Sequence, residues 1–248
     1  MNRLIATTAL AMLVGTTPLA SQTVMTDDER SAFRAEVRSY LLENPEVLME
    51  AIAVLEQRRA ESAAVSEETL LQVNADDIFN DPASWVGGNP DGDITIVEFM
   101  DYRCGYCKKA YSEVNELLSS DGNIRFIVKE FPILGEQSDL ASRFAISVLQ
   151  TEGAETYAKT HDALMTMRND VTPEVLARIA ADFGFSDTAA VMARMTSDEV
   201  SAVIDANQAL AGRLQITGTP TFVVQGTMLR GYVPLDGMRK VVAAEREG

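Results

Sequence analysis

Two cysteines separated by two residues, Cys104 and Cys107, stand where an apolar run gives way to a helical pattern. Residues 94–100 have the length and composition of a buried strand, and residues 104–118 repeat apolar side chains at helical spacing. The chain has no other cysteine. Two thiols at this spacing can close a disulfide, relay one to another protein, or supply half of a metal site. The fold must therefore contain a strand-to-helix connection that carries both thiols.

The first twenty residues have the pattern of a secretory signal. Arg3 precedes an uncharged stretch from Leu4 to Gly15, and small residues lead to a cleavage position near Ala20. The apolar stretch is too short to span a bilayer. We therefore expect residues 1–20 to be removed on export, with a retained anchor as the alternative.

Composition limits the use of the cysteine pair. An exported protein meets an oxidising compartment, but a disulfide across two residues closes too small a loop to stabilise the fold much. A closed zinc site would need two further ligands, and the chain offers one histidine, His161. Copper(I) bound by the thiols of several subunits remains an alternative. A formal net charge of −16 disfavours nucleic acid and anionic lipid as partners.

The N-terminal part of the mature chain, residues 21–76, reads as helical. Thr26 and Glu29 form a capping box before a helix expected over residues 27–43. Asn44 and Pro45 then start a second helix. Its apolar stripe must be covered, and we expect self-association, with folding back onto the main domain as the alternative. The stripe consists of Leu41, Leu48, Ile52 and Leu55.

The main domain is expected over residues 77–248. We predict strands at 94–100, 124–129, 221–224 and 227–230, helices at 104–118 and 235–246, and a helical block at about 138–214. A strand–helix–strand unit of this length favours parallel pairing with a right-handed crossover. This order predicts the α/β class, with a small mixed sheet and a helical insertion.

The position of each thiol predicts its chemical role. At the first turn of a helix, Cys104 meets unpaired backbone N–H groups and the positive end of the helix dipole, which favour its thiolate. Cys107 lies one turn further along the same face and should be the more buried sulfur. We expect Cys104 to be the nucleophile and Cys107 to resolve the mixed disulfide. Gly105 and Tyr106 help to set how oxidising the pair is.

Other residues are predicted to complete the site. Glu98 and Lys129 lie in neighbouring strands and could pair beneath the helix, where they would carry the proton for the buried sulfur; solvated strand-end charges are the alternative. Thr219–Pro220 is a candidate cis peptide, with a turn containing trans proline as the alternative. We interpret His161 as a half-buried helix residue rather than as a group near the sulfurs.

The stretches from Val97 to Lys108 and from Gly218 to Phe222, with the helical insertion between them, resemble the thioredoxin superfamily, in particular the exported DsbA-like thiol-disulfide oxidoreductases. The resemblance covers about residues 80–248. It implies a thioredoxin fold, a redox-active Cys104–Cys107 disulfide without another cofactor or a metal, and a cis-proline loop in which Thr219 and Pro220 hold the substrate peptide. The family's buried acid and lysine correspond to Glu98 and Lys129.

Two details refine this resemblance. The oxidase typically has Pro-His between its cysteines, whereas Gly105-Tyr106 with Thr219 before the proline is similar to the disulfide isomerase DsbC. Residues 40–55 resemble the multimerising extension of ScsC-like proteins. The resemblance implies a periplasmic homo-oligomer, joined through residues 21–76, that isomerises or reduces disulfides of exported proteins with a membrane redox partner of the DsbD or DsbB type. A dithiol oxidase and a non-catalytic copper-binding or chaperone module are the alternatives.

Overall fold

The computed structural model describes residues 25–247, and the chain divides into two compact units. The first unit ends at Arg59 and the second begins at Ala60. The predicted signal, residues 1–20, lies outside the described residues, as does the beginning of the predicted N-terminal segment. Within the part that is described, no helix is both long enough and apolar enough to cross a membrane.

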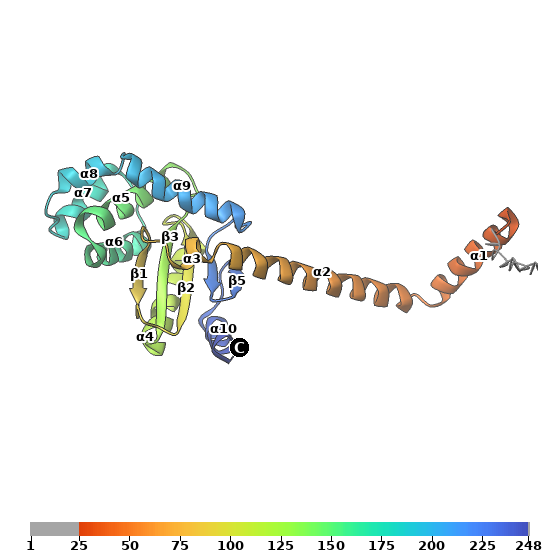
Figure 1. Cartoon of the computed structure of the whole chain (residues 1–248). Coiled ribbons are helices and arrows are strands. Elements are labelled where there is room, and N and C mark those ends of the chain that lie inside the picture. The colour runs from red at the N-terminus through yellow and green to blue at the C-terminus, as the bar shows by residue number, and fades with distance from the viewer. Residues whose placement is uncertain (1–24, 248) are drawn as a thin grey trace, which may run out of the picture. The chain divides into compact units, whose positions relative to one another are not determined.

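The order of helices and strands is that of an α/β protein with a helical insertion (Figure 1). The elements are α1 (Asp27–Glu43), α2 (Glu46–Val73), α3 (Ala75–Phe79), β1 (Trp85–Gly88), β2 (Ile94–Met100), α4 (Gly105–Asp121), β3 (Ile124–Glu130), α5 (Glu136–Glu152), α6 (Ala154–Thr166), α7 (Pro173–Asp182), α8 (Thr188–Arg194), α9 (Asp198–Arg213), β4 (Thr221–Val224), β5 (Thr227–Arg230) and α10 (Leu235–Glu247). The predicted order of elements after residue 93 is confirmed.

The described strands form one mixed sheet in the order β1-β3-β2-β4-β5. β2 and β3 run parallel, and the other neighbouring pairs are antiparallel. This confirms the parallel pairing expected for the strand–helix–strand unit. In the register of β2 and β3, Glu98 lies beside Val128 and Phe99 beside Lys129. Because successive side chains of a strand alternate between the two faces, Glu98 and Lys129 point to opposite faces.

Apolar side chains cover both faces of the sheet, and different helices pack on each. On one face, α4 and α10 enclose a core with β2 and β3, formed by Ile94, Ile96, Met100, Val114, Leu117, Phe126, Val128, Met238 and Val242. On the other face, α3, α9 and the end of α2 enclose a second core, formed by Leu71, Ile78, Val97, Phe99, Ile127, Leu210 and Leu214. Strands buried on both faces read as nearly continuous apolar runs, which is the pattern in residues 94–100.

Helices α5 to α9 form the insertion and gather beside one end of the sheet (Figure 1). Thr172, Asp187 and Ser197 each cap the helix that follows, by accepting a backbone N–H bond three residues on. The insertion was predicted over about residues 138–214, and its helices span Glu136–Arg213. Its first helix, α5, begins six residues after the end of β3. Because β2 and β3 are parallel, α5 starts near the C-terminal ends of both strands, where the cysteine pair also lies.

One strand was missed by the sequence analysis. β1 is an edge strand that pairs antiparallel with β3, with Trp85 opposite Val128. Two glycines end it, and this composition reads as a turn rather than as a strand. Tertiary contacts hold it instead: the Trp85 indole N–H donates to the Ala154 carbonyl oxygen at 3.1 Å, and its ring stacks on Tyr157 with a centroid distance of 5.3 Å.

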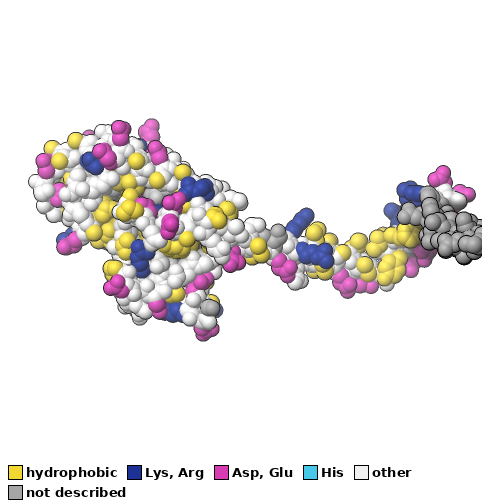
Figure 2. Space-filling model, in the orientation of Figure 1, with side chains coloured by type: hydrophobic (Ala, Val, Ile, Leu, Met, Phe, Trp, Pro, Cys, Tyr) yellow, Lys and Arg dark blue, Asp and Glu magenta, His cyan; other side chains and the backbone are white. Residues whose placement is uncertain are grey.

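The first unit consists of α1 and the beginning of α2. The predicted capping box is present, because Thr26 Oγ1 accepts from the Glu29 N–H at 3.3 Å and Glu29 Oε2 accepts from the Thr26 N–H at 2.8 Å. No residue of α1 is buried. Figure 2 shows hydrophobic side chains exposed along these helices. The large ones are Phe33, Val37, Tyr40, Leu42, Leu48, Met49, Ile52, Val54 and Leu55.

The end of α2 belongs to the second unit. Leu71 in α2 and Ile78 in α3 are buried in the second core, on the α9 face of the sheet. Glu67 in α2 forms an ion pair with Arg230 at 3.1 Å. The two units therefore divide within α2, whereas the sequence pattern placed the boundary near residue 77. A helix that runs on without Pro or Gly gives no local sign of where its packing against the domain begins.

Candidate active site

The cysteine pair lies at the N-terminus of α4, as predicted. Cys104 is the N-cap residue, and its sulfur accepts the backbone N–H of Cys107 at 3.4 Å. Its own N–H donates to the Asp101 carbonyl oxygen at 3.0 Å, which closes the turn out of β2. Cys104 retains 6% of its surface exposed and Cys107 retains none. An incoming sulfur therefore meets Cys104 first.

The surroundings of Cys104 favour its thiolate. Its pKa is lowered to about 5, mainly because the Cys107 thiol donates a hydrogen bond to it. Burial opposes this shift, while the Thr219 side chain and the backbone N–H groups of Cys107 and Tyr106 add to it. A sulfur at a helix N-terminus meets N–H groups that have no partner within the helix. Cys104 is therefore ionised at neutral pH.

The environment of Cys107 has the opposite effect. Burial raises the pKa of its thiol far above the ordinary value, and the hydrogen bond with Cys104 and the charge of Glu98 raise it further. Cys107 keeps its proton while Cys104 carries the charge. This asymmetry separates an attacking sulfur from a sulfur that reacts after Cys104 has been engaged.

The predicted proline loop lies against the cysteine pair. The Thr219–Pro220 peptide is cis, which confirms the prediction. The Thr219 carbonyl oxygen lies 3.2 Å from the Cys104 sulfur and accepts its S–H when Cys104 is protonated. The Pro220 carbonyl oxygen accepts the Gly231 N–H at 2.9 Å, which ties the loop to the end of β5. Residues more than a hundred positions apart in the sequence thus form one site.

Glu98 lies on the α4 face of the sheet, in the interior near the sulfurs. It is 2% exposed, and its Oε1 atom makes no hydrogen bond with the described residues. Burial raises the pKa of Glu98 to about 8, and the nearby charge of Cys104 contributes. The predicted location beneath the cysteine pair is therefore supported by the electrostatic contact of Glu98 with both sulfurs.

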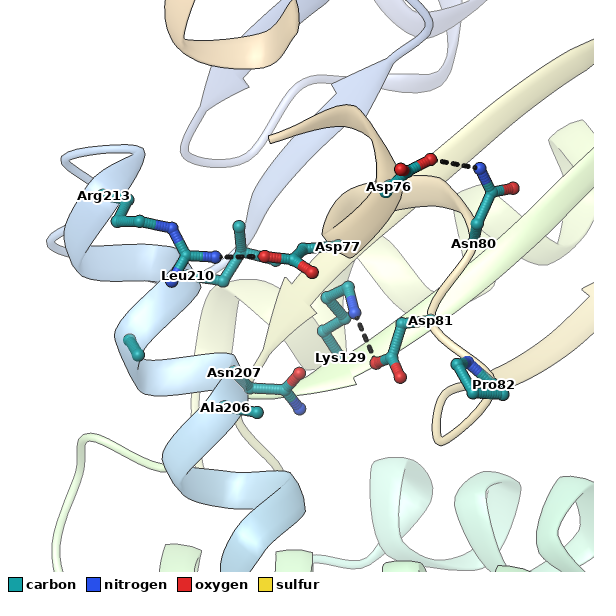
Figure 3. A pocket seen from close by; sticks show the side chains of 11 residues that line it. Asp76, Asp77, Asn80, Asp81, Pro82, Lys129, Ala206, Asn207, Leu210 and Arg213 are labelled. Atoms are coloured by element: carbon teal, nitrogen blue, oxygen red, sulfur yellow. Dashed lines mark hydrogen bonds and ion pairs between the residues drawn. The ribbon is translucent and has the colours of Figure 1, made fainter. Parts of the chain in front are cut away.

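The predicted pairing of Glu98 with Lys129 is wrong. The Lys129 ammonium group instead donates to Asp81 Oδ2 at 2.8 Å and to Ser84 Oγ at 3.0 Å. Lys129 and Asp81 line a cavity of about 390 Å³ between α9 on one side and α3 with the segment that follows it on the other (Figure 3). The strand register sends Lys129 to this face, and a single-residue difference in register would have sent it to the other.

Gly105 and Tyr106, the residues between the cysteines, are exposed. Nothing lies within 4 Å of a side-chain carbon built on Gly105. Tyr106 is 63% exposed, and its ring stacks on Tyr232 with a centroid distance of 6.3 Å. The Lys109 ammonium group lies 4.1 Å from the centre of the Tyr232 ring. The surface around Cys104 is therefore aromatic and locally cationic on a chain that is acidic overall.

Two more cations beside the cysteines are fixed by the insertion. The Lys108 ammonium group donates to the carbonyl oxygens of Leu164 and Met167 at the end of α6. The Arg103 guanidinium group donates to the Asn169 carbonyl oxygen at 2.9 Å. Sequence reasoning missed both contacts, because their acceptors are backbone atoms that no residue type reveals.

A buried polar cluster behind the site was also missed. His161 is 4% exposed, and its Nδ1 atom lies 3.0 Å from the Tyr102 hydroxyl group. The Tyr102 hydroxyl group lies 3.4 Å from that of Tyr157, which donates to Glu130. Burial lowers the pKa of His161 to about 4 and raises the pKa of Glu130 to about 7. His161 is thus a core residue of α6. In the sheet, Glu98 lies beside Val128, and Glu130 is two residues after Val128 in β3, so the two acids share one face. This alternation is the sequence signal that could have placed Glu130 near the site.

The sulfurs of Cys104 and Cys107 are the atoms with which the site could bind a soft metal. Among residues 25–247, no three side chains of the His, Cys, Asp or Glu types come together as a metal site would require. Copper binding across subunits therefore stays an alternative, as in the sequence analysis.

Comparison with known proteins identifies two regions of the chain. The family model described as DSBA-like thioredoxin domain matches residues 95–243, more than half of the chain. The family model described as Copper resistance protein ScsC N-terminal domain matches residues 29–61. The first match contains the cysteine pair, the insertion and the proline loop, and the second contains the exposed apolar helices.

Solved structures and curated proteins agree with these matches. A thioredoxin-like oxidoreductase from Silicibacter pomeroyi DSS-3 is 40% identical, with a TM-score of 0.65 over 70% of this chain and 98% of that one. A linker-deletion variant of ScsC from Proteus mirabilis is 26% identical, with a TM-score of 0.67 over 92% of this chain and 99% of that one. Disulfide bond formation protein D of Bacillus subtilis (strain 168) is 22% identical over 65% of this chain and 76% of that protein. The chain spans about a quarter of the curated Na(+)/H(+) antiporters NhaA that it also matches.

We expect the Cys104 thiol to titrate near pH 5, well below the value of about 8.5 for a free cysteine. Cys107→Ala removes the strongest hydrogen bond to the thiolate and should raise this pKa, while Cys107→Ser keeps a donor and should raise it less. Alkylation rates of Cys104 as a function of pH measure both. Equal midpoints for the two variants, or a wild-type midpoint at the free-cysteine value, would contradict this account.

We expect Glu98→Gln to change how stability depends on pH. The folded pKa of Glu98, about 8, exceeds its ordinary 4.5, so the fold retains a proton that the unfolded chain releases between these values. Wild-type stability is therefore full below pH 4.5 and falls as pH rises toward 8, by about 1.4 kcal/mol for each unit of pKa difference. The variant should lack this loss.

Urea denaturation of both proteins at acidic and alkaline pH measures the difference. Glu36→Gln makes the same substitution on the exposed surface of α1 and serves as the control. Parallel stability profiles for wild type and Glu98→Gln would show that Glu98 is not held protonated by the fold.

Proposed function

The chain belongs to the family of DSBA-like thioredoxin domains, and we propose that this thiol-disulfide oxidoreductase isomerises or reduces misplaced disulfides in cysteine-containing exported proteins. The observation that carries the proposal is the contrast between two sulfurs one helical turn apart. Cys104 is accessible, and its pKa is lowered by hydrogen bonds, while Cys107 is enclosed, and its pKa is raised by burial. This contrast provides a nucleophile and a protected resolving thiol.

The reaction begins with attack of the Cys104 thiolate on one sulfur of a client disulfide. A bond forms between Cys104 and that sulfur, and the other client sulfur leaves as a thiolate. In isomerisation, a second client thiolate attacks the client sulfur of the mixed disulfide, forms a new client disulfide and releases Cys104. In reduction, the Cys107 sulfur attacks Cys104, the Cys104–Cys107 disulfide forms, and the client sulfur leaves and takes up the proton that Cys107 releases. The protonation of Glu98 tunes this second step: burial raises its pKa to about 8, and only the ionised carboxylate raises the pKa of Cys107.

Substrate binding falls to the cis-proline loop. Thr219 lies within reach of the Cys104 sulfur, and Pro220 precedes β4 directly. We assign to Thr219 and Pro220 the backbone contacts that align a client segment with Cys104. Export through residues 1–20 would place the reaction in the periplasm, where a membrane partner of the DsbD type would return the pair to its reduced form.

Dithiol oxidation is the second candidate function, and one observation favours it. A Cys104 pKa of about 5 stabilises the reduced pair and makes the disulfide a stronger oxidant toward client thiols. In that case Cys104 and Cys107 would be reoxidised by a membrane partner of the DsbB type.

Self-association through the N-terminal helices favours isomerisation. Leu48, Ile52 and Leu55 recur on one side of α2 and are each 48% exposed in the single chain. The family match over residues 29–61 covers this stripe. A homo-oligomer joined here would present several cysteine pairs to one client and raise their effective concentration.

We expect the wild-type chain to restore activity to scrambled ribonuclease in a glutathione buffer, because Cys104 can attack non-native disulfides repeatedly. Cys104→Ser should lose this activity. If the wild type oxidises reduced ribonuclease but does not rescue the scrambled enzyme, the protein is an oxidase. If Cys104→Ser restores activity as well as the wild type does, the chain acts as a chaperone and the redox proposal fails.

We expect Leu48→Lys/Ile52→Lys to dissociate the oligomer, because charges would replace the apolar side chains that meet across its interface. Isomerisation should fall with the mass while insulin reduction is kept. Glu50→Lys, on the opposite side of α2, is the control and should leave the mass unchanged. Light scattering and the two activity assays measure these effects. An unchanged mass for the double variant would remove the argument from oligomerisation.

A further inference from the structure

The Arg230 side chain joins three segments of the second unit. It extends from the last residue of β5 to the end of α9 and to the C-terminal part of α2, which lie side by side (Figure 1). Its Nη1 atom donates to the Gln215 carbonyl oxygen at 2.9 Å. Its Nη2 atom donates to the Leu214 carbonyl oxygen at 3.3 Å and to Glu67 Oε2 at 3.1 Å. A guanidinium group suits such a set of acceptors, because its donors form a rigid planar fork.

The two carbonyl groups that Arg230 binds lie directly after the last turn of α9. The last carbonyl groups of a helix have no partner within it, and they carry the negative end of the helix dipole. The chain turns away here through Gln215, whose φ of 55° is left-handed. Arg213 is the last residue of α9, but its guanidinium group binds Asn74 and Asp77. Arg230 therefore fixes the point at which the chain leaves α9.

The loop that follows contains the cis peptide, and Arg230 also lies at the far end of this loop. In the register of β4 and β5, Arg230 is opposite the residue that follows Pro220. The next residue, Gly231, donates its N–H to the Pro220 carbonyl oxygen at 2.9 Å. Residues 216–220 are thus held at their start by the Arg230 side chain and at their end by the strand to which Arg230 belongs.

Glu67 meets Arg230 where α2 is packed against the domain. The side chain of Glu67 is 31% exposed, and that of Arg230 is 44% exposed. Leu71, one turn further along α2, is buried in the same core as Leu214. An ion pair usually costs the side-chain entropy of two mobile surface groups. Packing of α2 beside the end of α9 lowers this cost, because the backbone that carries Glu67 is already fixed.

We propose that Arg230 is a positioning residue for client binding, because it fixes both ends of the cis-proline loop, and that Glu67 holds the Arg230 side chain in place. The inference rests on the proposed function, in which the backbone of Thr219 and Pro220 aligns the client. A shift of residues 216–220 would move these backbone groups away from a client strand. The C-terminal part of α2 thus contributes to client binding through Glu67, apart from any role of α2 in self-association.

The test compares two symmetric disulfides in the full chain with Cys107→Ser, in which the mixed disulfide on Cys104 accumulates. One is the disulfide of a cysteine peptide with blocked ends and alanine on both sides of the cysteine. The other is hydroxyethyl disulfide, which has no peptide backbone. In each reaction the Cys104 thiolate bonds to one sulfur and the other sulfur leaves as a thiolate. The ratio of the two rate constants reports the client contacts, because a change in thiol reactivity or in the folded fraction affects both rates equally.

We expect Arg230→Gln to lower the ratio of the peptide rate to the hydroxyethyl disulfide rate about fivefold, which is the effect of losing about one hydrogen bond to the client. Arg230→Lys keeps the charge without the planar fork and should lower the ratio less. Glu67→Gln should lower it about twofold. Adding Glu67→Gln to Arg230→Gln should lower it no further, because both changes act on one contact.

Arg239→Gln and Glu116→Gln are the matched controls. The Arg239 side chain is 43% exposed, close to the value for Arg230, and it pairs with Glu116 at 3.3 Å between α10 and α4. The controls make the same two substitutions in an ion pair that does not touch the cis-proline loop. Both should keep the wild-type ratio.

An unchanged ratio in Arg230→Gln, or an equal fall in Arg239→Gln, would overturn the inference and leave the oxidoreductase function intact. An unchanged ratio in Glu67→Gln, or effects that add in the double variant, would overturn the role given to α2. If Cys104 reacts with neither disulfide in the Cys107→Ser chain, the proposed function fails together with this inference.

Discussion

The parallel pairing of β2 with β3 determines what lies beneath the cysteine pair. In this register Glu98 and Glu130 face α4 and the insertion, and Lys129 faces α3 and α9. The side of the sheet that carries the reactive sulfurs therefore contains two buried acids, while Lys129 is paired with Asp81 on the other side. Burial without a countercharge favours the neutral carboxyl group, so the local electrostatics depend on protons rather than on fixed ion pairs.

This arrangement explains the contrast between the two thiols. Cys104 stands at the end of α4, where N–H groups and the Cys107 thiol stabilise its charge, and Cys107 stands one turn deeper, facing Glu98. One helical turn is sufficient because the stabilising N–H groups belong to the helix terminus alone. The cis-proline loop adds a further contact to the outer sulfur, through Thr219. The site is thus assembled on the end of one helix and completed by segments distant in the sequence.

Most helices and strands could be predicted because their signals are local. Capping residues, apolar runs and periodicity located α1, α4, β2, β3, β4, β5 and α10 within a few residues. β1 escaped because its two glycines weaken the strand pattern, and Trp85 is held by the insertion. The division within α2 also escaped, because packing against the domain begins without any change in helical pattern.

The sequence by itself determined the chemistry of the pair. The spacing of Cys104 and Cys107, their place after a strand, and the threonine before Pro220 identify the two sulfurs and the loop that meets them, because each is a short-range pattern. Only the tertiary structure decided which charged residues share their face of the sheet, and that Arg103 and Lys108 bind backbone oxygens of the insertion. Strand register and backbone hydrogen bonds between distant segments control both, and neither depends on the type of residue alone.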